Sequence, residues 1–204
     1  KKAAIDAAFH QVLTNGQPVN LDKQPYTSYW GKELIVNLRI VPQKTKDGRI
    51  TGMVIVVDDV TAEARAEALQ TAVYHIAQAA DQAASLDDLF PAIHEIIKTV
   101  LPADNFYFAL YDETADLIRF PYFTNEKVFT PWPSRQPNKG WTELILRQGV
   151  SQLVDEERHQ TMTERGEMEY LGLRAAVWLG VPLIVGTRTI GVMAVLHYQD
   201  PHAY

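Results

Sequence analysis

The fold is decided by residues 177–198, which read VWLGVPLIVGTRTIGVMAVLHY. Apolar and β-branched side chains fill two long segments, residues 174–185 and 189–198, as is typical of buried strands. Gly186, Thr187 and Arg188 separate them and predict a short hairpin turn. We therefore expect two long strands, side by side, near the end of the chain.

Upstream of this pair, residues 105–111 also have no polar face, so we expect a central strand that is covered on both sides. Residues 117–123 are its predicted hairpin partner. A Pro-rich loop follows at residues 124–139. We then expect a short helix over residues 140–147 that ends at Gly149, a brief strand over 151–154, and a polar helix and loop over 155–172.

The N-terminal third has a different pattern. Residues 3–13 show helical spacing of apolar side chains, and residues 34–40 and 50–57 show the two-residue alternation of strands, with Asp47 and Gly48 in the turn between them. A weaker strand is predicted over residues 17–22. Together these segments predict a helix followed by an antiparallel meander.

A long helix is predicted from Thr61 onward, with Asp59 or Thr61 as its cap. Its apolar side chains repeat every seven residues, at Ala62, Leu69, Ile76 and Ala83 and, four residues later in each heptad, at Ala66, Val73 and Ala80. This pattern favours a parallel coiled-coil linker, and hence a homodimer through residues 61–85. The alternative is a single helix that packs on its own domain.

A second helix follows the linker. Ser85 and Asp88 have the spacing of a capping box. Pro91 lies too deep for a first helical turn, so we expect the regular helix to begin near Pro91 and residues 86–90 to form a looser lead-in.

Charge and composition limit the function. The formal charge is −6, and all of it lies in residues 86–204. Such a chain offers no basic surface to nucleic acid or anionic lipid, so we expect no nucleic-acid partner and no direct membrane contact in this segment. Cysteine is absent, which excludes disulfides, Cys-ligated metals and Cys-linked chromophores. No cofactor is predicted, and a cytoplasmic location fits this composition.

Polar clusters give little sign of catalysis. Asp155, Glu157 and His159 form the one group that could supply acid and base chemistry, but acidic residues at a helix start are more often solvated caps. We assign no catalytic residue and no metal ligand. Aromatic side chains beside the Pro-rich and polar loops are better candidates for a small-ligand cavity. The candidates are Phe108, Phe123, Trp132, Trp141, Tyr170 and Trp178.

Two stretches resemble a GAF domain. LDDLFPAIH (residues 86–94) with ADNFYFALYD (103–112) is similar to the opening of that family, and WLGVPL (178–183) with IGVMAV (190–195) is similar to its paired late strands. The resemblance implies a mixed or antiparallel sheet with helices on one face and a ligand cavity, or its vestige, on the other. The long C-terminal helix typical of the family is missing before Tyr204.

GRITGMVIVVDDVT (residues 48–61) resembles the end of a PAS domain that runs into a signalling helix. The expected fold is therefore α+β, with three parts. Residues 1–60 form a partial PAS-like antiparallel sheet with its last helix and three strands, residues 61–85 a linker helix, and residues 86–204 a GAF-like domain.

These resemblances imply a non-catalytic sensory region of a bacterial signal-transduction protein, and favour a sensor histidine kinase over a diguanylate cyclase or a transcription regulator. A small ligand or partner would bias the linker helix. The alternatives are a vestigial GAF unit that serves only in dimerisation and, last, a small enzyme that uses the Asp155 cluster.

Overall fold

The computed structural model describes residues 2–130 and 132–204, which form two compact units, one up to Gln70 and one from Thr71 on. The elements of the first unit are α1 (Lys2–Asn15), β1 (Val19–Thr27), β2 (Glu33–Lys44) and β3 (Ile50–Asp59). The helix α2 (Thr61–Gln82) begins in the first unit and ends in the second. The second unit continues with α3 (Leu86–Ile97), β4 (Phe106–Asp112), β5 (Leu117–Thr124), α4 (Trp141–Gln148), β6 (Gln152–Asp155), α5 (Glu156–Glu164), β7 (Val177–Val185) and β8 (Arg188–His197).

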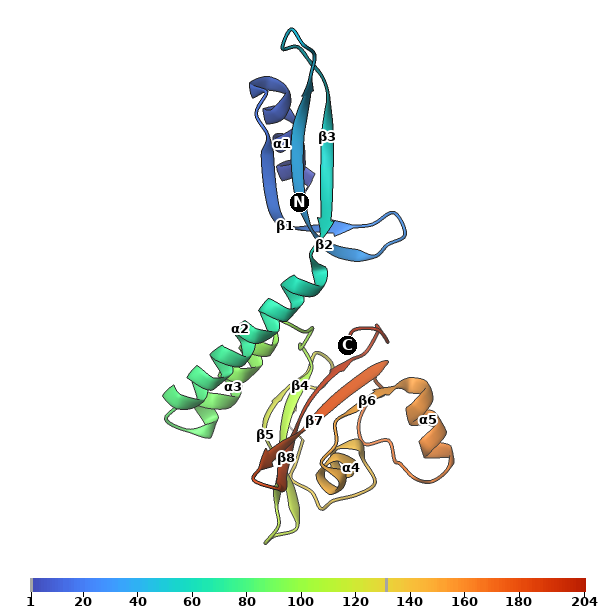
Figure 1. Cartoon of the computed structure of the whole chain (residues 1–204). Helices are drawn as coiled ribbons and strands as arrows, with labels where there is room; N and C mark the ends of the chain where they lie inside the picture. Colours follow the sequence, from blue (N-terminus) through green and yellow to red (C-terminus); the bar gives the residue numbers. More distant parts are fainter. Residues whose placement is uncertain (1, 131) are drawn as a thin grey trace. The chain divides into compact units, whose positions relative to one another are not determined.

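In the first unit the strands form an antiparallel meander in the order β1-β2-β3, as predicted. Helix α1 covers one face of this sheet (Figure 1), where Ala8 and Val12 pack on Ile40. The β2–β3 turn places Gly48 at φ +85°, a backbone conformation that glycine adopts without strain.

Hydrogen bonds connect the start of α2 to β2. Asp59 accepts a hydrogen bond from the backbone N–H of Thr61, the first residue of α2, and so satisfies one of the free N–H groups at the helix start. The Thr61 hydroxyl accepts from the backbone of Ile35, and the Val60 N–H donates to the Ile35 carbonyl. These bonds hold the first turn of the helix against the central strand of the small sheet.

The apolar stripe of α2 is only partly buried. Leu69 is 55% and Val73 is 67% exposed, whereas Ala72, the residue directly before Val73, is buried. Ile76 and Ala83, which belong to the predicted stripe, are half-buried. One side of α2 therefore packs within the chain, and an adjoining apolar strip lies free.

The second unit is built on a five-stranded sheet in the order β5-β4-β8-β7-β6, and every neighbouring pair is antiparallel. The α+β fold is thus confirmed, with an antiparallel rather than a mixed sheet. The predicted burial of residues 105–111 on both faces holds for the first part of β4, where Phe106, Tyr107, Phe108 and Ala109 are each at most 3% exposed, whereas Leu110 and Tyr111 are half-buried.

Helix α3 begins earlier than predicted. Ser85 caps it by accepting a hydrogen bond from the Asp88 N–H, and the helix runs from Leu86 straight through Pro91. The expectation of a loose lead-in is wrong because Pro91 deprives only the Asp87 carbonyl of its helical partner. That carbonyl belongs to the exposed first turn, where water can replace the lost bond.

Each face of the large sheet has its own core. Phe106, Phe108 and Val195 point toward α3 and pack with Phe90, while Tyr107 and Ala109 point to the opposite face. There they meet α4 through Ile145, so helices cover both faces rather than one. His94 of α3 is buried and joins its face to the sheet, with one ring nitrogen 2.8 Å from the Tyr122 hydroxyl and the other 2.6 Å from the Ala103 carbonyl oxygen.

Among the described residues, no helix is both long and apolar enough to cross a membrane.

Candidate ligand-binding site

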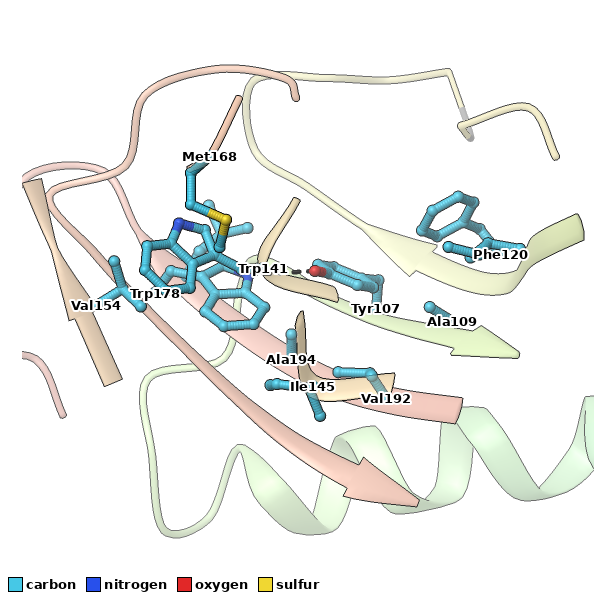
Figure 2. Close-up of a cluster of buried hydrophobic side chains, with 12 residues drawn as sticks. Tyr107, Ala109, Phe120, Trp141, Ile145, Val154, Met168, Trp178, Val192 and Ala194 are labelled. Atoms are coloured by element: carbon cyan, nitrogen blue, oxygen red, sulfur yellow. Dashed lines mark hydrogen bonds between the residues drawn. The ribbon is translucent and has the colours of Figure 1, made fainter. Parts of the chain in front are cut away.

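A cavity of about 70 Å³ lies on the α4 side of the large sheet. Its floor is formed by Tyr107 of β4, Trp178 of β7 and Leu196 of β8, and its walls come from α4 and the loops on either side of it. Figure 2 shows this layer, with Trp141 and Trp178 beside Tyr107. A buried water needs roughly 10–15 Å³, so the space exceeds what a single water requires.

Helix α4 brings two polar side chains to the cavity. Gly140 begins the helix in an extended conformation and Gly149 ends it at φ +65°, as predicted for the C-terminal glycine. Between them Trp141 is 6% and Glu143 is 1% exposed, and both line the cavity. A side chain on Gly140 would contact Glu143 Oε2 at 2.5 Å, so this glycine leaves room for the carboxylate.

The cavity floor is held by a short hydrogen-bond chain. The Trp178 indole donates to the Tyr107 hydroxyl at 3.2 Å (Figure 2), and the same hydroxyl lies 2.9 Å from Thr142 Oγ1. Burial raises the pKa of Tyr107 to about 12, so it stays neutral. Gly180 makes this arrangement possible, because a Cβ there would lie 2.2 Å from the Trp178 ring.

Glu143 is paired through one oxygen alone. Its Oε1 accepts from Arg135 Nη1 in an ion pair and from the Asn138 N–H at 3.0 Å. Arg135 is in turn fixed by a two-way backbone pairing with Ile118 of β5. The Pro-rich loop is thereby anchored to both the sheet edge and α4, while Glu143 Oε2 has no partner.

The third wall is aromatic. His159 of α5 stacks on Tyr170 with ring centroids 3.8 Å apart and meets the Trp141 ring edge-on at 5.7 Å. Burial lowers the pKa of His159, against a hydrogen bond to the Glu169 backbone that raises it. The ring is therefore neutral at pH 7, and its Nε2 is buried without a partner.

Two of the buried polar atoms without partners belong to well-buried side chains that line the cavity, namely Trp141 Nε1 and Glu143 Oε2. Such atoms are rare in folded proteins, because a buried donor or acceptor that stays unpaired costs about 1–3 kcal/mol. The side chains around the cavity therefore carry hydrogen-bonding capacity that the fold itself does not use.

The structure brings together some of the residues predicted from sequence. Trp132, Trp141 and Trp178 line the cavity. Phe123 stands behind Trp132, with ring centroids 5.0 Å apart, and Tyr170 stands behind His159. Phe108 is on the other face of the sheet against Phe90, because residues alternate along a strand and Tyr107 takes the cavity side.

Sequence reasoning missed the residues that give the cavity its polarity, which are Tyr107, Arg135, Thr142 and Glu143. Tyr107 could have been found from the alternation along residues 105–111. No signal in the sequence marks Glu143 as buried, because its burial depends on Arg135, which arrives from a loop.

The side chains of the acidic cluster considered for catalysis, Asp155, Glu157 and His159, do not point to a common site. Asp155 caps α5 by accepting from the Arg158 N–H at 2.8 Å, and Glu157 is exposed on the outside of that helix. Both line a shallow surface hollow, whereas His159 points to the cavity. In the described part of the chain, no cluster of three His, Asp or Glu side chains has the geometry to hold a metal ion.

A wider surface hollow of about 680 Å³ lies beyond Glu143, near the β7–β8 turn. Two polar pairs in this hollow are formed by the protein itself: the Tyr111 hydroxyl donates to Asp116 at 2.8 Å, and Arg188 forms an ion pair with Glu113. The smaller cavity is the better candidate site, because it lies among aromatic rings and is lined by both well-buried side chains, Trp141 and Glu143, that keep a polar atom without a partner.

Comparison with solved structures places this fold among known ones. The GAF domain of a phosphoenolpyruvate-protein phosphotransferase from Coxiella burnetii has a TM-score of 0.55 at 16% identity, over 68% of this chain and 82% of that one. Free methionine-R-sulfoxide reductase from Neisseria meningitidis, in complex with its substrate, gives 0.54 at 14% identity, over 68% and 77%. The GAF domain of A. aeolicus nlh2 in an inactive state gives 0.50 at 10% identity, over 67% and 83%. At these identities the likeness establishes the fold alone.

No curated protein matches the chain. A family model described as GAF domain matches residues 83–204, which include α3, the whole five-stranded sheet and the cavity. The chain therefore belongs to the GAF domain family.

Proposed function

We propose that this chain is a non-catalytic sensory region of a bacterial signal-transduction protein, in which the GAF domain binds a small molecule in the cavity beside α4. The observation that carries the proposal is a cavity bounded by aromatic rings and lined by two buried side chains, Trp141 and Glu143, that each keep an unpartnered polar atom. A preformed apolar site with a few convergent polar groups is the usual form of a small-ligand site.

Signalling is proposed to run through α2. Its first turn is bonded to β2 through Thr61 and Ile35, and its last turns precede the capped helix α3 of the GAF domain. An occupant that prefers one conformation of the GAF domain shifts the balance between conformations of this helix by its difference in affinity for them.

The same helix is the proposed dimer contact. Leu69 and Val73 leave an apolar strip exposed on α2, at positions that continue the seven-residue repeat. In a parallel pair of such helices, small shifts along the contact pass to whatever follows in the protein.

We assign the segment before α2 to the end of a PAS domain and the whole to the cytoplasmic part of a sensor histidine kinase, with a diguanylate cyclase or transcription regulator as alternatives. The helix, the three-stranded meander and the direct entry into α2 support the PAS assignment. Among the solved structures of the same fold, the A. aeolicus and Coxiella domains are described as a domain in an inactive state and as part of a phosphotransferase.

Native mass spectrometry of the freshly purified chain tests ligand binding. Ala175 lines the cavity and is half-buried, so Ala175→Phe fills the space. We expect a small molecule bound to the wild type and absent from Ala175→Phe. If both variants carry the same molecule, or neither carries one, the cavity is not the binding site of the purified protein.

Light scattering tests the dimer contact. Val73→Glu puts a charge on the exposed strip, and we expect it to shift the protein from dimer to monomer at high micromolar concentration. His75→Glu, which changes an exposed neighbour off the strip, is the matched control and should stay dimeric. A wild-type chain that is monomeric at this concentration contradicts the dimer.

A further inference from the structure

The loop after α5 forms part of the solvent-facing wall of the cavity. It spans residues 166–174, and its Glu169, Leu171 and Leu173 line the cavity. Met168 is buried, and no other side chain in this fully described segment is. Segments with so few buried contacts open at a lower free-energy cost than the core beneath them. The loop therefore covers the cavity and is able to move without the sheet.

Contacts with Lys139 and His159 hold the middle of this loop. The Glu169 N–H donates to the Lys139 carbonyl at 2.9 Å, and Lys139 Nζ donates to the Gly166 carbonyl at 3.2 Å. The ring of His159 stacks on Tyr170 with centroids 3.8 Å apart, and one of its nitrogens forms a hydrogen bond with the Glu169 backbone. His159 thus joins α5 to the loop.

The His159 ring fits this place in its neutral form. Its Nε2 is buried, and no described residue offers that atom a hydrogen-bond partner. In the neutral ring the other nitrogen holds the proton for the bond to Glu169, and Nε2 is a bare acceptor. Protonation gives Nε2 an N–H group, and a buried charged donor without an acceptor is strongly destabilising. The protonated ring therefore has to leave its place to reach water.

The neighbouring positive charges act in the same direction. The Arg158 guanidinium lies 5.1 Å from the ring centre of Trp141, and that of Arg174 lies 4.6 Å from the ring centre of Tyr170. These are the two rings that His159 contacts, so a charge on His159 would lie between two fixed positive charges. Burial lowers the pKa of His159, and Arg174 lowers it further.

The other ionisable groups nearby do not offset this effect. Glu143 is ion-paired to Arg135, Glu156 lies 3.8 Å from Arg174, and no described carboxylate reaches His159 Nε2. Burial raises the pKa values of the two tyrosines in the cavity wall, which stay neutral. The ionisable groups that line the cavity with His159 are Tyr107, Arg135, Glu143, Glu169 and Tyr198.

On the basis of the proposed ligand-binding function, we infer that residues 166–174 are a lid over the cavity and that His159 is its pH-sensitive latch. Neutral His159 holds the lid closed, and a proton on His159 releases it. Gly166 and Gly172, at φ +69° and +108°, are the positions at which the backbone turns as the lid opens. Mild acid thereby gives a ligand access to the cavity.

The size of the effect follows from the two forms of His159. In the open form the ring titrates with the ordinary histidine pKa of about 6.5. The closed form takes up the proton only at lower pH, because its pKa is lowered. The closed lid is therefore most stable above about pH 6.5 and loses stability as the pH falls. Between pH 7.5 and 5.5 the opening constant rises by up to about tenfold.

Amide hydrogen exchange of the full chain, followed residue by residue by NMR, tests the lid. Each rate is divided by that of an unstructured chain at the same pH, which gives a protection factor. The reporter is the Glu169 N–H, and the reference is the Leu196 N–H of β8, which donates to the Asn105 carbonyl at 3.1 Å. At pH 7.5 we expect Glu169 to be at least tenfold less protected than Leu196, because the lid opens without the sheet.

Two variants test the latch. In the wild type the protection of Glu169 should fall about five- to tenfold between pH 7.5 and 5.5. His159→Phe keeps a flat ring against Tyr170 but takes up no proton, so its Glu169 protection should change less than twofold over this range. His10→Gln, which changes an exposed histidine of α1, is the control and should respond as the wild type does.

The outcomes separate this inference from the proposed function. Equal protection of Glu169 and Leu196 at pH 7.5 would mean that the loop opens only with the whole domain, so that there is no lid. An equal fall in the wild type and His159→Phe would show that His159 is not the latch. In either case a molecule that native mass spectrometry finds in the wild type and not in Ala175→Phe leaves the proposed function standing. A lid that responds through His159 in a chain that carries no molecule overturns ligand binding and leaves the lid.

Discussion

Replacing Gly180 with alanine tests the packing on which the cavity floor depends. The new Cβ would lie 2.2 Å from Cη2 of Trp178 and 2.8 Å from Cδ1 of Ile145, both well inside ordinary carbon contact. The Trp178 ring therefore has to move by about 1 Å, which disturbs its 3.2 Å hydrogen bond to Tyr107. Overpacking of this kind costs about 1–3 kcal/mol, and the hydrogen bond adds about 1 kcal/mol.

Alanine also gains slightly over glycine in an extended strand, by about 0.5–1 kcal/mol. The expected net loss in the free energy of unfolding is therefore about 1–3 kcal/mol. Urea denaturation followed by near-UV circular dichroism measures it, because the signal depends on the fixed setting of the buried tryptophans.

The matched control is Gly52→Ala in β3, where the new Cβ meets only the side-chain oxygen of Gln43 at 3.3 Å. That variant should be as stable as the wild type or up to about 1 kcal/mol more stable. If Gly180→Ala is as stable as the wild type and keeps its near-UV spectrum, Trp178 is not held over Gly180 as described.

Three further predictions concern the same domain. Tyr107→Phe should lower the free energy of unfolding by about 1–3 kcal/mol in chemical denaturation, because the Trp178 indole and Thr142 lose a buried partner. Tyr111→Phe is the control and should change little, because its hydroxyl bonds exposed Asp116. Equal losses in the two variants would argue against the buried network. Ser85→Ala should lower stability by about 1 kcal/mol, because α3 loses its cap. Ser134→Ala, which changes an exposed serine, is the control and should have no measurable effect. A Ser85→Ala variant as stable as the wild type would mean that the cap contributes nothing. Burial lowers the pKa of His159, so the unfolded chain takes up a proton at higher pH than the folded one, and stability should fall as pH drops below about 6.5 toward the folded-state pKa. His159→Phe should remove this part of the pH dependence in urea midpoints measured at pH 7.5 and 5.5; an unchanged dependence would rule out His159 as its source.

Much of the fold follows from local patterns in the sequence. The run from Phe106 to Ala109 has no charged side chain, and these four residues of β4 are indeed buried on both faces. The glycine after α4 takes the left-handed conformation that its position predicts. These features depend on neighbours in sequence, which is why periodicity and turn chemistry reveal them.

The polar part of the site depends on contacts between distant segments and could not be predicted in this way. Glu143 lies in a helix whose sequence would suit an exposed face, and it is buried only because Arg135 and Asn138 reach it from the Pro-rich loop. For Phe108 the sequence predicts burial correctly but does not show which face of the sheet the side chain occupies. Composition marks it as a core aromatic, but the face it occupies depends on where its neighbour Tyr107 finds hydrogen-bond partners.

The central idea is that the state of the cavity is communicated to the linker helix, and amide hydrogen exchange of the full chain tests this most directly. Ala175→Phe fills the cavity, and Ala115→Phe places the same side chain in the exposed β4–β5 turn as a control. We expect the first variant to change exchange in α2 as well as around Trp141, and the second to leave α2 unchanged. Altered exchange around Trp141 with no difference anywhere in residues 61–82 would contradict the account.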